Sequence, residues 1–503
     1  TGPNPTKPDD PIFWAFNKIA PTTNVFEGAT TYLASMERGT AGFLQVPADA
    51  RLAALTALAD GGVDPATVPA APADTVLRAD GPIKHVFFIV RENRSYDQVL
   101  GDASIGNGDP TLSVFPQKVT PNIHSLVTRF PLLDNVLANS EASIEGHYWT
   151  AAGIVPDYVN RNWVQEYAGR MRPNDFGMYA VAWPGNGFLF DQAERQGISY
   201  FNYGEAFDGG SPSVADANRS PEALAELEKV NAKSDLGPDL TPGGCYASDA
   251  TIGQTIGKLQ LFDSSLPAGA AKGSISHVDC FRARFADQLA AGSVPALNYL
   301  ALTSDHTRGT EPGFPVPSAM MADSDTAIGE LIDTISHSAI WSSSAIFVVE
   351  DDSQDGADHV DAHRIPVMVV SPYAKTGTVI STQYDLLSFV RSVELIIGMK
   401  PLSLNDALAV PLYDAFASTP VNAAPVDGIP AGVDLLEFNT LASPWAAESA
   451  ALGLGETDTV SQVMLDAIIW RSVYGEDAVP PPPGPNAEST GGADGATVPD
   501  ADD

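Results

Sequence analysis

The sequence predicts an α/β fold with a central, mostly parallel sheet and helices on both of its faces. Three observations support this prediction. Continuous apolar runs such as 85–90 and 345–349 are typical of buried strands. Segments with helical patterns lie between these runs, and strands that alternate with helices favour a parallel sheet. Polar clusters follow several of the strands, at the sheet edge where sites form in such folds.

The first 81 residues are expected to form a small N-terminal segment outside this sheet. Two short strand patterns, 31–36 and 41–46, surround a turn and predict a hairpin. A short helix is expected at about 48–60. It is followed by a linker rich in proline and alanine at 61–76.

The main alternation of strands and helices begins at residue 82 and is expected to extend to residue 478. Thr120 followed by Pro121 is a favourable helix start, because Thr caps well and Pro suits the first helical position. Ser143 opens another helix. Strands are expected at 85–90, 131–139, 198–203, 296–303, 345–350 and 366–371, and further helices at 121–129, 318–338, 382–397 and 459–473.

Two regions depart from this alternation. Residues of about 205–290 lack a clean period and are expected to be an insertion that covers the site. Residues 479–503 begin with a run of prolines and continue into Gly, Ala and Asp, a composition that predicts a disordered acidic tail. Cys245 and Cys280 lie within the insertion range, and they are either bridged or two unrelated thiols.

The chain is strongly acidic. Its 503 residues include 27 Lys and Arg against 63 Asp and Glu, a formal net charge of −36. This balance argues against binding to nucleic-acid backbones and to anionic membrane surfaces, which both need basic surfaces. The sequence contains no apolar run long enough to cross a membrane. Such an acidic surface suits an extracytoplasmic protein, at the cell surface, in the periplasm or secreted.

The segment 350–364 is the strongest functional signal. It follows the apolar run 345–349 and contains five Asp, one Glu and two His. Carboxylates this dense repel one another, and burying them is costly unless a cation neutralises them. Asp and His are also common ligands of divalent metals. The alternative is a solvated acidic loop, but the position at a strand end and the interleaved histidines favour a metal site.

Weaker polar pairs occupy the ends of other predicted strands. Glu92 and Asn93 follow 85–90, and Asp305 and His306 follow 296–303. Ser143 lies at a predicted helix N-terminus, where backbone N–H groups and the helix dipole favour an anion. Taken alone, Ser143 is better explained as a plain capping serine. The topology predicts that these groups converge with 350–364 at one edge of the sheet.

Together these motifs resemble a bacterial phosphoesterase family that includes phospholipase C and acid phosphatases of the AcpA type. Residues 91–101 are similar to its E-N-R-S/T-F/Y-D signature, and 350–364 match its E-D-D-x-Q-D-G-x-D-H-V-D-A-H-R segment almost residue for residue. The other matching blocks are T-P-N-I-H-S-L at 120–126, S-I-E-G-H-Y-W at 143–149 and S-D-H-T at 304–307. The resemblance covers about residues 82–478 and implies an alkaline phosphatase-like fold.

The resemblance also implies roles for individual residues. The nucleophile would be Ser143, and His147, four residues later on the same helix face, would be a further catalytic residue. The metal cage would consist of Glu92, Asn93, Asp351 and Asp352. A second metal site or a phosphate-binding histidine cluster would consist of Asp305, His306, His359 and His363, with His306 or His363 as the proton donor to the leaving oxygen.

The expected activity is hydrolysis of phosphate esters through a phosphoserine at Ser143, assisted by one or two divalent metal ions. Oxygen ligands favour Ca, Mg or Mn and histidines favour Zn, so the metal stays open. The substrate would be a small phosphate ester or a phospholipid head group. The alternatives are a phosphodiesterase or phospholipase C that uses the same site, or an inactive surface-binding protein. An intact Ser143 and a complete Asp and His set speak against the inactive protein.

Residues 1–60 resemble the segment that links a YVTN-type β-propeller to the phosphoesterase domain in some relatives. The hairpin at 31–46 would then be a remnant of the last propeller blade. We therefore expect a β-propeller upstream of this chain in the unprocessed protein.

Overall fold

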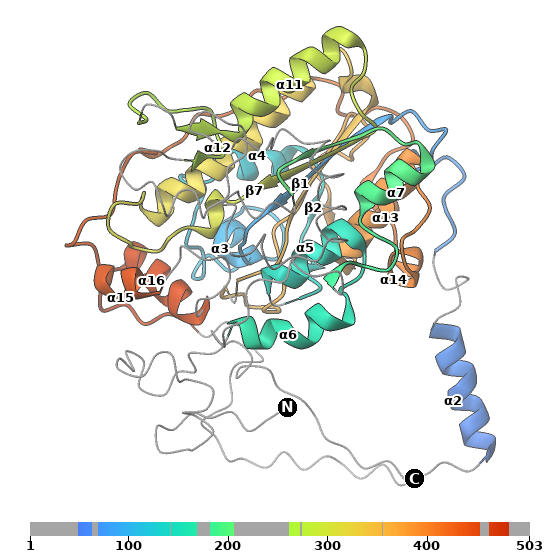
Figure 1. Cartoon of the computed structure of the whole chain (residues 1–503), viewed down its shortest axis with the longest axis horizontal. Helices are drawn as coiled ribbons and strands as arrows, with labels where there is room; N and C mark the ends of the chain where they lie inside the picture. Colours follow the sequence, from blue (N-terminus) through green and yellow to red (C-terminus); the bar gives the residue numbers. More distant parts are fainter. Residues whose placement is uncertain are drawn as a thin grey trace.

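A five-stranded sheet forms the centre of the computed structural model (Figure 1), which describes residues 49–62, 69–140, 142–167, 182–205, 261–271, 274–354, 356–452 and 462–481. Four of its strands run parallel, and only the edge strand β9 is antiparallel. The strand order across the sheet is β4 (Tyr200–Tyr203), β7 (Leu297–Leu302), β1 (His85–Arg91), β8 (Ser344–Glu350) and β9 (Met368–Val370). The predicted mixed α/β fold with a mostly parallel sheet is therefore confirmed.

The central strand β1 sets the register of its neighbours. Arg91, its last residue, is level with Leu302 of β7 and Glu350 of β8. The three parallel strands therefore end at the same level. The residues that follow them must emerge side by side at one edge of the sheet.

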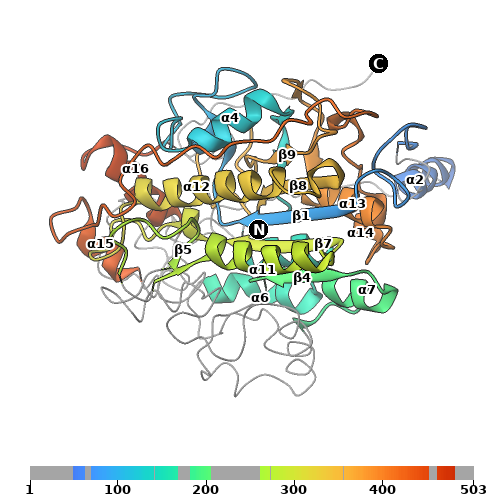
Figure 2. The same ribbon diagram turned by 90° about the horizontal axis from the view of Figure 1, so that it is seen from above.

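Helices cover both faces of the sheet (Figure 2). On one face lie α4 (Pro121–Arg129), α11 (His277–Ala291) and α12 (Pro317–Ser336). Phe87 of β1 packs there against Phe281 and Phe285 of α11, with ring centroids 6.1 and 5.8 Å apart.

The other face carries α5 (Ser143–Ala152), α7 (Leu189–Gln196) and α13 (Leu386–Ile397) (Figure 1). Phe88 contacts Tyr299 across the strands, and Phe190 of α7 covers Tyr299 at 5.4 Å. Successive residues of β1 thus pack against different helix layers, because successive side chains of a strand point to opposite faces.

The helix predicted at 121–129 is confirmed residue for residue, and the other predicted helices are present with ends shifted by a few residues. The single strand predicted over 131–139 is wrong. The chain there forms two short pairings, β2 (Leu132–Leu133) with β10 (Val379–Ile380) and β3 (Val136–Leu137) with β11 (Tyr384–Asp385). Between them Asp134 and Asn135 bond to the main chain of 380–384, so the segment runs beside the sheet and not within it.

Helix α11 lies within the range that the sequence assigned to an insertion. Its aromatic side chains pack on the sheet, so residues 277–291 contribute to the core. Cys280 on this helix is disulfide-bonded, and Cys245 is the only other cysteine of the chain. The hairpin expected at 31–46 and most of the predicted tail lie outside the described residues.

The remaining elements lie outside the five-stranded sheet. No helix within the described residues is both long enough and apolar enough to cross a membrane. These elements are α2 (Asp49–Gly62), α3 (Tyr96–Leu100), α6 (Asp157–Tyr167), β5 (Leu261–Phe262), β6 (Ile275–Ser276), α14 (Leu404–Leu408), α15 (Ala446–Ala451) and α16 (Gln462–Tyr474), with 3-10 turns at Ser304–His306, Trp341–Ser343 and Tyr413–Ala415.

Candidate active site

Buried polar side chains gather where β1, β7 and β8 end. At the base of this cluster lies Arg91, whose guanidinium is fully buried. Its Nη1 donates to Glu350 Oε1 at 2.6 Å, and its Nη2 lies 2.9 Å from Asp305 Oδ2. Burial raises the pKa of Asp305 to about 6 although Arg91 opposes that rise. Arg91 therefore binds both Asp305, which follows β7, and Glu350, the last residue of β8. These two ion pairs fix the spacing between the ends of the strands.

Ser143 lies directly above these strand ends, at the first position of α5. Its hydroxyl donates to Asp352 Oδ2 at 2.8 Å and accepts a hydrogen bond from Asn93 Nδ2 at 2.9 Å. The same Asn93 amide also donates to Asp352 Oδ1 at 2.7 Å. Burial raises the pKa of Asp352 to about 6. The serine oxygen is thus held between an amide donor and a carboxylate that can accept its proton.

The close approach of α5 to β8 depends on Gly146. A Cβ atom at this position would lie 2.7 Å from the carbonyl carbon of Asp351, which real Cβ atoms essentially never show. Only glycine therefore allows the helix to bring Ser143 and His147 down onto the strand end.

His147 lies one helical turn after Ser143 and faces three carboxylates. Its Nδ1 is 3.0 Å from Glu205 Oε1, and its Nε2 is 3.6 Å from Glu92 Oε1 and 3.7 Å from Asp351 Oδ2. Burial by itself lowers the pKa of His147, but Glu205, Glu92 and Asp351 outweigh it and raise that pKa well above its usual value. Conversely, burial raises the pKa of Glu92, and the imidazole of His147 outweighs this and lowers it.

The residues around Glu92 fit a divalent cation. Glu92, His147 and Asp351 each offer one ligand atom, and these atoms all lie within 4.8 Å of one another. Asn93 is fully buried, and its Oδ1 has no hydrogen-bond partner among the described residues. Buried acceptors without a partner are costly, and a bound cation would satisfy one. Two carboxylates, an amide oxygen and an imidazole form a donor set that suits a divalent metal.

His306 lies beside this cluster, as predicted from its position after β7. Its Nδ1 bonds to the carbonyl oxygen of Thr307 at 2.9 Å. Burial lowers the pKa of His306, and the nearby charge of Glu92 opposes this. Asp305, by contrast, lies below the cluster, where it binds Arg91 and the backbone N–H of Glu92 at 3.1 Å.

His359 belongs to a second network, which is centred on the buried Arg364. The imidazole Nδ1 of His359 lies 2.6 Å from Asp97 Oδ2. The guanidinium of Arg364 binds both Asp358 oxygens through Nε at 3.0 Å, and Asp97 Oδ1 through Nη2 at 3.1 Å. It also stacks over the ring of Tyr96 at 4.1 Å.

The structure therefore does not bring His359 together with Asp305. The sequence hypothesis assumed that the acidic residues of 350–364 needed a metal ion. In this part of the segment an internal guanidinium neutralises the carboxylates. His363, which directly precedes Arg364, is about one-third exposed, and its Nδ1 lies 2.9 Å from Asp361 Oδ1.

Two parts of the site, namely Glu205 and the pair of Arg94 and Asp466, were not identified from the sequence. Glu205 follows β4 at the same sheet edge, so the rule that located Glu92 would have located it too. Arg94 is buried beneath the site, where its Nη2 donates to the carbonyl oxygen of His306 at 2.8 Å and its Nη1 lies 3.7 Å from Asp466 of α16. Helix α16 thus holds Arg94 in place beneath the site. A single Asp on an amphipathic helix does not indicate such a role in the sequence.

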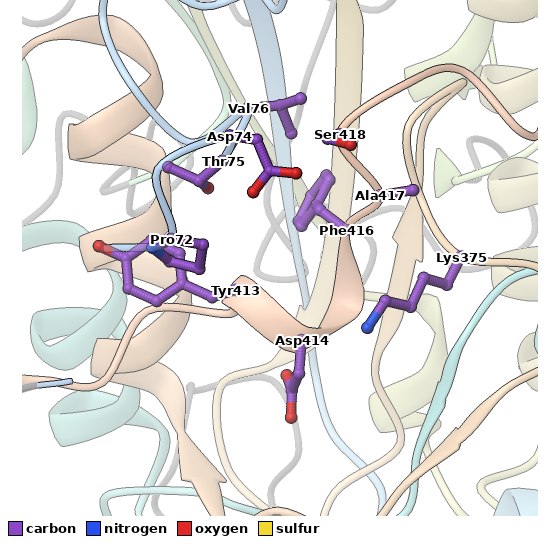
Figure 3. A pocket seen from close by; sticks show the side chains of 10 residues that line it. All are labelled: Pro72, Asp74, Thr75, Val76, Lys375, Tyr413, Asp414, Phe416, Ala417 and Ser418. Atoms are coloured by element: carbon purple, nitrogen blue, oxygen red, sulfur yellow. The ribbon is translucent and has the colours of Figure 1, made fainter. Parts of the chain in front are cut away.

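A pocket of about 350 Å³ lies elsewhere, between the segment before β1 and the segments after β9 (Figure 3). These segments adjoin the amino-terminal ends of β1 and β8, because Ser371 Oγ donates to the carbonyl oxygen of Ser344. The charged groups in its lining are Asp74, Lys375 and Asp414. Within the described residues, no hydroxyl of this lining is hydrogen-bonded to a carboxylate of the lining, whereas Ser143 is hydrogen-bonded to Asp352, so the carboxyl-terminal edge of the sheet is the better candidate for chemistry.

The model of the Phosphoesterase family matches residues 83–400, which is more than half of the chain. The chain belongs to the Phosphoesterase family. It is a hydrolase that acts on ester bonds, and all the residues of the candidate site described so far except Asp466 lie inside the matched range. A search of curated proteins found no match.

Several solved structures are similar to this phosphoesterase at low sequence identity. A protein of the alkaline phosphatase superfamily from Vibrio parahaemolyticus is 12% identical, with 73% of this chain and 79% of that chain covered and a TM-score of 0.43. The lipoteichoic acid synthase of Listeria monocytogenes is 13% identical, with coverages of 70% and 81% and a TM-score of 0.39. The phosphonate monoester hydrolase of Agrobacterium radiobacter is 12% identical, with coverages of 63% and 74% and a TM-score of 0.38.

Proposed function

We propose that this phosphoesterase hydrolyses phosphate monoesters with the help of a bound divalent cation and through a phosphoserine at Ser143. The observation that supports this most directly is the position of the Ser143 hydroxyl, hydrogen-bonded to both Asn93 and Asp352 at a helix N-terminus. A hydroxyl becomes a competent nucleophile when an adjacent base removes its proton. The helix N-terminus favours the negative charge that then develops.

In the first step, Ser143 Oγ attacks phosphorus and its proton passes to Asp352 Oδ2. The bond between phosphorus and the ester oxygen breaks, and that oxygen takes a proton from His306, whose imidazolium form the negative charges of Glu92 and of the bound phosphate favour against the effect of burial. In the second step, a water molecule gives its proton to His306 and its oxygen attacks phosphorus. The Ser143 oxygen leaves and recovers its proton from Asp352, so phosphate is released and the site returns to its starting state.

Glu92, Asn93 and Asp351 would hold the cation beside these groups. When bound, the cation supplies positive charge that offsets the charge on the phosphoryl oxygens. The chain itself offers little such charge at the site, because carboxylates outnumber cationic side chains around Ser143. Exhaustive chelation should therefore abolish activity, and full activity without a metal would contradict the proposal.

The direct test of the nucleophile is Ser143→Ala. Turnover of p-nitrophenyl phosphate should fall by at least about 10³-fold, because removal of a nucleophile leaves only binding and electrostatic contributions. Acid-quenched wild-type protein should carry phosphate on Ser143 by peptide mass spectrometry. A variant that stays active, with an unchanged circular dichroism spectrum, would show that the nucleophile lies elsewhere.

A diesterase or phospholipase C would use the same reacting groups and differ only in its pocket. Activity on bis-p-nitrophenyl phosphate in place of p-nitrophenyl phosphate would identify that alternative. Activity on neither ester, with metal bound and the fold intact, would favour a binding protein.

We also propose that the protein works outside the cytoplasm. Cys280 is disulfide-bonded, and disulfides persist mainly in oxidising compartments. Fractionation of the native host, with detection of the oxidised chain under non-reducing conditions, tests this. A chain found reduced in the cytoplasm would contradict it.

A further inference from the structure

Two carboxylates face the Nε2 atom of His147 at distances that are long for hydrogen bonds. Its Nε2 lies 3.6 Å from Glu92 Oε1 and 3.7 Å from Asp351 Oδ2. Hydrogen bonds between nitrogen and oxygen extend to about 3.2 Å, so neither carboxylate is at hydrogen-bond distance. Two ligand atoms that are each about 2.1 Å from one ion lie about 3.4 Å from each other in a tetrahedral arrangement. The separations therefore fit three ligands of a shared cation.

The other ring nitrogen of His147 is held by a group that the proposed reaction does not use. Glu205 is buried, and its Oε1 lies 3.0 Å from His147 Nδ1. The loop position of Glu205 is itself fixed, because its backbone N–H donates to Asn202 Oδ1 at 2.9 Å and its carbonyl oxygen accepts from Asn202 Nδ2 at 2.8 Å. A carboxylate fixed in this way sets the ring orientation and keeps the proton on Nδ1. This leaves Nε2 to face Glu92 and Asp351.

We propose that His147 binds the cation through Nε2, together with Glu92 and Asp351, and that Glu205 is a positioning residue for this ligand. Histidines that bind metals commonly donate their other ring N–H to a carboxylate, which orients the ring and increases its basicity as a ligand. The inference rests on the proposed cation-dependent function, and it assigns His147 to metal binding and not to proton transfer.

Two other carboxylate–histidine clusters of the described chain do not offer the same arrangement. The Asp97–Asp358–His359 cluster already contains the guanidinium of Arg364. The Asp333–His337–Asp427 cluster is largely exposed, and exposed acidic groups often occur without a metal. The buried position of Glu92 and Asp351, and the unpartnered Oδ1 of the adjacent Asn93, distinguish the His147 cluster from both.

The test is titration of the metal-free, full-length chain with Co²⁺, followed by visible absorption and calorimetry. His147→Gln should weaken Co²⁺ binding by about 10–100-fold or more and change the visible spectrum, since an imidazole ligand is lost. Glu205→Gln should weaken binding by about 10-fold, and Glu205→Ala by more, because Gln can still accept from Nδ1 whereas Ala leaves the ring unrestrained.

Glu394→Gln is the matched control, since it also replaces a buried glutamate by glutamine, on α13 beside Arg391. It should leave Co²⁺ affinity and the spectrum unchanged. Thermal unfolding of each metal-free variant shows whether the fold is kept. For a Glu205 variant that does not fold, the His147→Gln measurement decides the question.

The outcomes separate this inference from the proposed function. If the wild type binds Co²⁺ and hydrolyses p-nitrophenyl phosphate, but His147→Gln and Glu205→Gln bind Co²⁺ with unchanged affinity and spectrum, the inference is wrong and the function stands. Tighter binding by His147→Gln would mean that the imidazole only neutralises the carboxylates, which also overturns the inference. If the wild type binds no metal, both proposals fail.

Discussion

The clusters Glu92–His147–Asp351 and Asp97–Asp358–His359 each bring two carboxylates and one imidazole within ligand distance. In the second cluster the buried guanidinium of Arg364 binds both carboxylates. In the first, the carboxylates face an imidazole that is itself held by a third carboxylate, Glu205. The same residue types therefore surround a buried guanidinium in one place, and in the other they surround the position where we propose that a cation binds. The residue types of the two clusters do not distinguish them. The position of the buried guanidinium of Arg364 does.

Asp351→Asn should produce the largest effect, because it removes a charged ligand from the first cluster. We expect kcat/KM for p-nitrophenyl phosphate to fall by at least about 10³-fold, which is ~4 kcal/mol of transition-state stabilisation. Metal content should fall in parallel, while the metal-free fold should be no less stable. Steady-state kinetics with metal analysis checks this. Full metal content in an inactive variant would mean that Asp351 acts otherwise than as a ligand.

Arg364→Met should lower the stability of the fold and leave metal binding unchanged, the opposite of what we expect for Asp351→Asn. It leaves Asp97 and Asp358 buried without their guanidinium, and the free energy of unfolding should fall by about 3 kcal/mol. The remaining folded protein should bind Co²⁺ with wild-type affinity. Chemical denaturation and Co²⁺ titration measure the two quantities. A loss of metal affinity equal to that of Asp351→Asn would show that the two clusters are not separate.

A third carboxylate pair extends the comparison to neutralisation by a proton. Burial, together with Asp406, raises the pKa of Glu394 to about 9 although Arg391 opposes it. The folded state therefore keeps a proton that the unfolded chain loses above its ordinary pKa of 4.5. This contribution to stability is complete below about pH 4.5 and is lost as pH rises towards about 9.

Glu394→Gln should remove this pH dependence. The expected change is at most about 1.4 kcal/mol of unfolding free energy per pH unit, with the variant more stable than the wild type on the alkaline side. Denaturation curves between pH 5 and about pH 9 measure it. Parallel curves for the two proteins would mean that Glu394 is already ionised in the fold.

Much of the site followed from one rule about strand ends. The apolar runs located β1, β7 and β8, and parallel pairing then placed Glu92, Asn93, Asp351 and Asp352 beside one another, with Ser143 above them. The helix at 121–129 was predictable because Thr120 and Pro121 are both strong local signals. The roles of the site residues stay predictions.

The rest depended on contacts that no local pattern reveals. Asp358 and His359 belong to the same dense motif as Asp351, but their direction is set by Arg364, which reaches Asp97 from far along the chain. Glu205 is a single acidic residue after a short strand, and only its distance to His147 gives it a meaning. Residues 131–139 have the pattern of one strand, but they form two short pairings because their partners, 379–380 and 384–385, are separate segments. The pattern of 131–139 alone does not reveal this separation.

Gly146 lies between Ser143 and His147 on the turn of α5 that touches Asp351. Because both side chains project from one rigid helical turn, their mutual distance does not depend on how closely the helix approaches the sheet. A larger residue at 146 would shift the hydroxyl and the imidazole together, away from every carboxylate on the strands. Gradual enlargement of this one residue would therefore vary the helix-to-sheet distance while leaving the spacing along the helix constant, a separation of two geometric variables that substitutions of the reacting groups themselves cannot achieve.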